Sequence, residues 1–121
     1  MDLTGRYVLL GLIWLVAAML QGLWMAIGGL TQFVTMHIVM VLSGGVVGIL
    51  FGTVLHAWPK AGSDRWANAQ FIIWNVGVLI MTVGAATRAQ GHGDAIIAAG
   101  SLVVLAATLM MLMIFQRSAR A

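Results

Sequence analysis

The chain has 121 residues and a mass of 12.9 kDa, with 62% hydrophobic and only 7% charged residues. Soluble domains carry roughly 45–50% apolar and about 25% charged residues. This composition therefore excludes a water-soluble monomer and predicts an integral membrane protein. The net charge of +3 is attributed to membrane orientation, and no nucleic acid is expected as a partner. The absence of cysteine excludes disulfides, thiolate metal sites and iron–sulfur clusters.

Four stretches without acidic or basic residues follow one another along the chain: residues 7–30, 35–58, 66–87 and 95–116. Each is long enough for a hydrocarbon core, which needs about 20 helical residues. Backbone in lipid must satisfy its own hydrogen bonds, so each stretch is predicted to be a helix. The short links between them indicate antiparallel neighbours. The sequence thus predicts one domain over residues 1–121, an all-α integral membrane protein that forms a four-transmembrane-helix up-down bundle.

The basic residues predict the orientation of this bundle. Arg88 lies alone at one end, and five basic residues lie at the other end, with both termini and the middle link: Arg6, Lys60, Arg65, Arg117 and Arg120. The positive-inside rule therefore places both termini in the cytoplasm, with a bacterial-type inner (cytoplasmic) membrane as the expected location of this multi-pass chain. Tyr7, Trp58 and Trp66 are expected in an aromatic belt at the inner boundary.

His37, near the outer end of the second predicted helix, is the first candidate functional residue. Histidine is uncommon at membrane depth and marks a functional site by default, and a neutral imidazole is a good iron ligand. Gly44 and Gly48 fall within roughly 20° of the direction of His37 at 100° per residue. Two interpretations stay open. The stripe is either a bed for a flat macrocycle bound by His37, or ordinary close packing of small residues against another helix.

The third predicted helix contributes three further candidates. Asn75 lies within the apolar stretch, where an unpaired amide is costly, so it is expected to bond another helix or a ligand. Trp74 beside it is expected to line the same pocket. Arg88 lies at the outer end, on the side of His37. It is expected either to pair with an acidic cofactor group such as a haem propionate or to extend to the lipid headgroups.

The second and third predicted helices combine a histidine, spaced glycines, a terminal proline and a Gln-Phe pair ahead of an asparagine. The residues are Thr35-Met36-His37, Gly44, Pro59, Gln70-Phe71, Asn75 and Gly77. This pattern resembles the small four-helix membrane proteins related to haem-copper oxidase subunit I. The first three predicted helices are also similar to the styrene oxide isomerases, which are membrane haem-b proteins. The shared residues are Gly22-Leu23-Trp24-Met25, Gly28-Gly29, His37, Gly44 and Asn75-Val76-Gly77.

These resemblances imply haem b with His37 as the axial ligand of the iron, but they do not carry over a reaction. A haem-b protein with a redox or small-ligand role is the first functional hypothesis. No cluster of three histidines exists for a copper site, so a binuclear oxygen-reducing centre is excluded. The positions that align with the polar pocket of the isomerases are Ser43, Phe71 and Leu79, and two of these are apolar. An isomerase that uses ferric haem as a Lewis acid to convert an apolar epoxide to an aldehyde remains an alternative.

A non-catalytic accessory subunit of a larger membrane complex is the third possibility. Four helices of this length give a thin core, and their outer faces carry more small residues than lipid contact requires. We therefore expect a homo-oligomer or a partner subunit in addition to the lipid bilayer.

Overall fold

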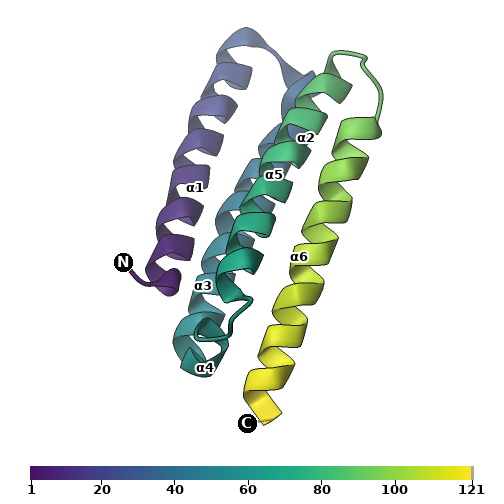
Figure 1. Ribbon diagram of the computed structural model, residues 1–121. Helices are drawn as coiled ribbons and strands as arrows, with labels where there is room; N and C mark the ends of the chain where they lie inside the picture. Colours follow the sequence, from purple (N-terminus) through teal and green to yellow (C-terminus); the bar gives the residue numbers. More distant parts are fainter. Residues whose placement is uncertain (121) are drawn as a thin grey trace.

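The computed structural model describes residues 1–120, and four long helices dominate it (Figure 1). Helix α1 (Leu3–Gly28) is followed by a second long helix, Thr31–Ala57, and then by α5 (Ala67–Ala89) and α6 (Ala95–Arg120). Successive long helices run in opposite directions, so that both termini lie at one end of the bundle. All four are long and apolar enough to cross a membrane. The predicted all-α architecture with four such helices is confirmed.

The helix bounds agree with the predicted stretches to within a few residues, and local chemistry explains the differences. Helix α1 begins earlier because the Asp2 carboxylate accepts a hydrogen bond from Gly5 N at 2.8 Å and caps the first turn. It ends at Gly29, whose φ of 63° is a left-handed conformation that glycine adopts without strain. Helix α6 continues to Arg120, since basic side chains are favourable near a helix C-terminus.

The second long helix is not uniformly α-helical, which the sequence analysis did not predict. It comprises η1 (Thr31–Phe33), α2 (Val34–Ile38), η2 (Val39–Val47) and α3 (Gly48–Ala57). The η2 segment is a π-helix of nine residues. A π-helix bonds each residue to the fifth along the chain and usually occurs as a single turn, frequently at functional sites. This wider segment begins directly after the turn that carries His37.

A short helix, α4 (Pro59–Gly62), follows α3 at the end of the bundle that carries the termini. Pro59 occupies its first turn, where the missing N–H is not needed. The sequence pattern predicts a link here and no helix, so α4 is an addition to the predicted elements.

Glycine sets the spacing within each pair of neighbouring helices. A Cβ on Gly11 of α1 would lie only 3.1 Å from the backbone oxygen of Gly45 in the second long helix. A Cβ on Gly84 of α5 would lie only 2.3 Å from the backbone nitrogen of Ile97 in α6. Each of these contacts brings two helix backbones together, as small residues do at helix interfaces in membranes. The chain therefore forms two tightly packed antiparallel pairs, α1 with Thr31–Ala57 and α5 with α6.

Aromatic side chains and one buried amide join the two pairs near the end that carries the termini. The Tyr7 ring meets Phe51 and Phe71 edge-on, with centroids 5.8 and 4.8 Å away, and Phe51 meets Trp74 at 4.7 Å. The Tyr7 hydroxyl donates to Gln70 Oε1, while Gln70 Nε2 donates to the carbonyl oxygen of Ala107 at 3.1 Å. This contact links α1, α5 and α6.

The predicted place of Tyr7 in an aromatic belt is wrong, because its side chain is only 1% exposed. The buried Gln70 amide gives the Tyr7 hydroxyl a partner inside the bundle, so the ring needs no contact with headgroups. Trp58 and Trp66 are both 47% exposed at the same end, as expected for belt residues.

Gly84→Ala tests the packing of α5 against α6. The added Cβ meets backbone rather than a flexible side chain, so the helices must move apart. We expect a loss of about 1–3 kcal/mol in the free energy of unfolding, measured by circular dichroism during denaturant titration in detergent micelles. Gly62→Ala is the control, since its Cβ would lie 4.0 Å from the nearest side-chain atom. Equal stability of the two variants would contradict this packing.

Tyr7→Phe tests the buried hydrogen bond between the helix pairs. The substitution keeps the ring contacts but leaves the Gln70 oxygen buried without its donor, which typically costs about 1–3 kcal/mol. The same unfolding assay measures the loss. Thr53→Val removes an exposed hydroxyl that bonds only within its own helix, so this control variant should unfold like the unmodified protein. A Tyr7→Phe variant as stable as that control would show that the bond adds nothing.

Candidate functional site

The His37 side chain is held against α1 at the end of the bundle opposite the termini. A Cβ on Gly22 would lie 2.8 Å from His37 Cε1, so the absence of a side chain at Gly22 makes room for the imidazole. His37 Nδ1 lies 3.0 Å from Oε1 of Gln21, the preceding residue in α1. The ring is half-buried, and two neighbouring residues of α1 fix its position.

The contacts of Gln21 determine which imidazole nitrogen carries the proton. Gln21 Nε2 donates to the carbonyl oxygen of Phe33 at 3.4 Å and to Met25 Sδ at 3.0 Å. The amide oxygen therefore faces His37 and accepts a hydrogen bond from Nδ1. In the neutral ring the lone pair is then on Nε2, which makes no hydrogen bond within residues 1–120. Metal-ligating histidines are typically oriented in this way.

The sequence analysis gave Gln21 no role beside His37. The available signal was a single amide, Gln21, in the outer half of the first apolar stretch. A partner for an amide at that depth was required on energetic grounds. Its identity depended on the register of the two helices, which a single sequence does not give.

Gly44 and Gly48 also face α1, and α1 fills the space beside them. A Cβ on Gly44 would lie 2.5 Å from Cγ of the Trp14 ring, so this indole covers the glycine directly. At Gly48 the backbone of Gly11 takes the corresponding place. The space beside this stripe, which one of the two interpretations gives to a macrocycle, is occupied by another helix in this structure. On this face the structure supports the second interpretation, which is close packing of small residues against another helix.

Asn75 makes the interhelical hydrogen bond that was expected as one of its two possible roles. Its Oδ1 accepts from Trp14 Nε1 at 3.3 Å, and its Nδ2 donates to the carbonyl oxygen of Phe71 at 2.9 Å. The same indole thus contacts Gly44 and Asn75. An apolar groove of about 360 Å³ opens beside this contact, between α1 and α5. It is lined by Leu10, Ile13, Trp14, Ala17, Asn75, Val76 and Leu79.

Neither Trp74 nor Arg88 forms a hydrogen bond, ion pair or ring contact with His37 within residues 1–120. Trp74 is only 3% exposed and packs in the aromatic core, where its Nε1 has no hydrogen-bond partner within the described chain. Arg88 Nε lies 3.0 Å from Asp94 Oδ1, and both side chains are largely exposed. The groove at Asn75 is lined by none of the other five candidate residues. Arg88 has an acidic partner from the chain itself.

The donor atoms of the described residues fit a haem ligand better than a bare metal site. No three His, Cys, Asp or Glu side chains gather within residues 1–120 to hold a metal ion. Haem iron needs only an axial ligand from the protein, because the porphyrin supplies the nitrogens in its plane, and a histidine is the usual donor. His37 fits this role through Nε2. Gly44 does not fit as part of a porphyrin bed while Trp14 lies on it.

Comparison of the chain with protein-family models, with curated proteins and with solved structures found no match in any of the three. The resemblances to the haem-copper oxidase relatives and to the styrene oxide isomerases therefore stay predictions from sequence. The case for any function depends on the geometry around His37.

Gly44→Ala and Gly48→Ala separate helix packing from a cofactor bed. Both variants gain similar helix propensity, but only at Gly44 does the Cβ meet a ring at 2.5 Å; at Gly48 the nearest atom is 3.8 Å away. We expect Gly44→Ala to displace Trp14 and to lose about 1–3 kcal/mol of unfolding free energy, with little loss for Gly48→Ala. Denaturant titration monitored by tryptophan fluorescence measures both. Equal losses would argue against this packing.

Proposed function

We propose that this chain is an integral-membrane haem-b-binding protein in which His37 is the axial ligand of the iron. The observation that supports this role is the fixed imidazole: Gln21 holds Nδ1, Gly22 leaves room for the ring, and Nε2 makes no hydrogen bond to the described part of the chain. A single oriented imidazole at membrane depth is a functional candidate by default.

The surface of the bundle supports insertion in a lipid bilayer. Large apolar side chains are exposed on all four long helices, including Ile27, which is 80% exposed. We assign the end that carries the termini to the cytoplasm of a bacterial-type inner membrane, because all the basic residues except Arg88 belong to that end. His37 then lies toward the outer side of the membrane.

Each residue near His37 has a defined part in this proposal. The Gln21 oxygen fixes the ring orientation and makes Nε2 a better electron donor, because it accepts the Nδ1 proton in a hydrogen bond. Gly22 keeps the ring in place by allowing contact with its backbone. Arg88, at the same end of the bundle, is the basic side chain that would pair with a propionate. The propionate would then replace Asp94 as the partner of Arg88. We assign Gly44 and Gly48 to helix packing.

Bound haem b would supply either a one-electron couple or an open coordination position for a small ligand. This redox or small-ligand role is favoured over the epoxide isomerase. An isomerase needs its substrate pocket beside the iron. The groove at Asn75 contains Leu79, one of the aligned positions, but His37 does not line it.

The absorption spectrum of the full chain tests the haem site. The protein is expressed with haem precursor, purified in detergent, and measured oxidised and reduced. We expect a Soret band and a haem b pyridine haemochrome, and we expect His37→Ala to abolish both. His56→Ala is the matched control, because that exposed histidine lies near the opposite end of the second long helix. It should keep the full spectrum.

A second variant tests the oriented imidazole. Gln21→Leu leaves His37 in place without its Nδ1 acceptor, and the loss of such a partner typically costs about 10–100-fold in metal affinity. Haem titration measures the change. A normal spectrum in His37→Ala would refute the ligand assignment. A colourless protein that copurifies with a larger complex would favour the accessory subunit instead.

A further inference from the structure

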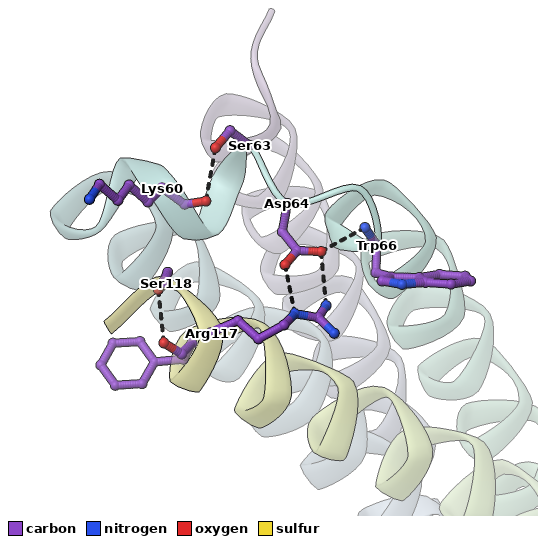
Figure 2. Close-up of polar contacts among 7 residues, drawn as sticks. Lys60, Ser63, Asp64, Trp66, Arg117 and Ser118 are labelled. Atoms are coloured by element: carbon purple, nitrogen blue, oxygen red, sulfur yellow. Dashed lines mark hydrogen bonds and ion pairs between the residues drawn. The ribbon is translucent and has the colours of Figure 1, made fainter. Parts of the chain in front are cut away.

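An ion pair fixes one arginine at the end of the bundle that carries the termini (Figure 2). Arg117 Nε lies 3.1 Å from Asp64 Oδ2, and Arg117 Nη2 lies 3.0 Å from Asp64 Oδ1. Asp64 Oδ1 also accepts a hydrogen bond from Trp66 N at 2.9 Å, and the Asp64 side chain is only 14% exposed. The pair therefore joins the last turns of α6 to the segment that leads into α5, and it holds the guanidinium in one orientation.

A groove of about 240 Å³ lies beside this pair, between the start of α5 and the last turns of α6. It is lined by Trp66, Met110, Met113, Ile114 and Arg117. The positions from Met110 to Arg117 span about 10 Å of helix at 1.5 Å per residue. Apolar side chains thus form the length of the groove, and a fixed cation lies at its terminal edge.

The charges around this edge are mostly positive. Arg65 lies over the Trp66 ring, with Cζ 5.5 Å from the ring centroid, and Arg120 follows Arg117 by one turn of α6. Asp64 neutralises one of these three cations. It engages only Nε and Nη2 of Arg117, and Figure 2 shows a guanidinium nitrogen that points away from the carboxylate. Arginine carries five N–H donors, so Arg117 keeps donors for a further acceptor.

We infer that this groove binds an anionic phospholipid, with an acyl chain along Met110 and Met113 and the phosphate at Arg117 and Arg65. The inference depends on the proposed membrane insertion but not on the haem site. Basic pockets between membrane helices bind anionic headgroups, and an exposed tryptophan such as Trp66 is typical of the headgroup level. A phosphatidylcholine headgroup carries its own cation, so it gains less from the surplus positive charge.

Native mass spectrometry of the full chain in detergent tests this site, with dioleoyl phosphatidylglycerol and dioleoyl phosphatidylcholine as probes. We expect the anionic lipid to bind more tightly. Arg117→Gln should weaken its binding about fivefold, because one basic residue near the membrane surface contributes about that factor. Arg6→Gln is the matched control. It removes the same charge from the same end, but on α1, which does not line the groove.

Met113→Trp tests the acyl groove without a change in charge. Met113 is 54% exposed, so the larger side chain can fill the groove without disturbing the core. We expect this variant to weaken binding of phosphatidylglycerol, and we expect inorganic phosphate not to compete with the lipid. Equal affinity for the two lipids, equal weakening by Arg6→Gln and Arg117→Gln, or unchanged lipid binding in Met113→Trp would each overturn the inference.

Discussion

The close approach of helix backbones at glycine positions is the constraint on which the rest of the structure depends. Gly84 leaves no room for a side chain against Ile97, and Gly11 leaves little room for one against the backbone of Gly45. Between helices in lipid there is little hydrophobic driving force, so such packing contacts supply much of the association. They also set the register. His37 meets Gln21 because the glycine contacts between α1 and the second long helix fix how far these two helices are shifted along each other.

Two polar contacts, one buried and one partly buried, then join the tightly packed pairs. Trp14 with Asn75 links α1 to α5, and Tyr7 with Gln70 links the same helices nearer the termini. In an apolar environment an unpaired polar group is costly, so each of these pairs favours one arrangement of the helices over others. The aromatic rings of Phe51, Phe71 and Trp74 fill the space around the second contact. Polar pairing and ring packing therefore fix the contact between the two helix pairs.

The sequence predicted the helices better than their contacts, for physical reasons. The length of a charge-free stretch depends only on neighbouring residues, and the four long helices were found in this way. Periodicity identified the helix face of small residues that contains Gly44. It did not identify the helix that covers this face, because Trp14 is distant in sequence. The same limit applies to Gln21 beside His37 and to Gln70 beside Tyr7. The π-helix in η2 could not be predicted, because an α-helical period was assumed throughout.

The thin core of the bundle determines how small molecules can reach His37. Only 11% of the apolar window of α1 and 17% of that of α6 are buried, so the outermost helices shield little interior volume. His37 is only half-buried, so part of its side chain reaches the surface of the bundle. Molecules that dissolve in oil would approach the imidazole sideways, by partitioning from the hydrocarbon phase, without a water-filled passage through the protein.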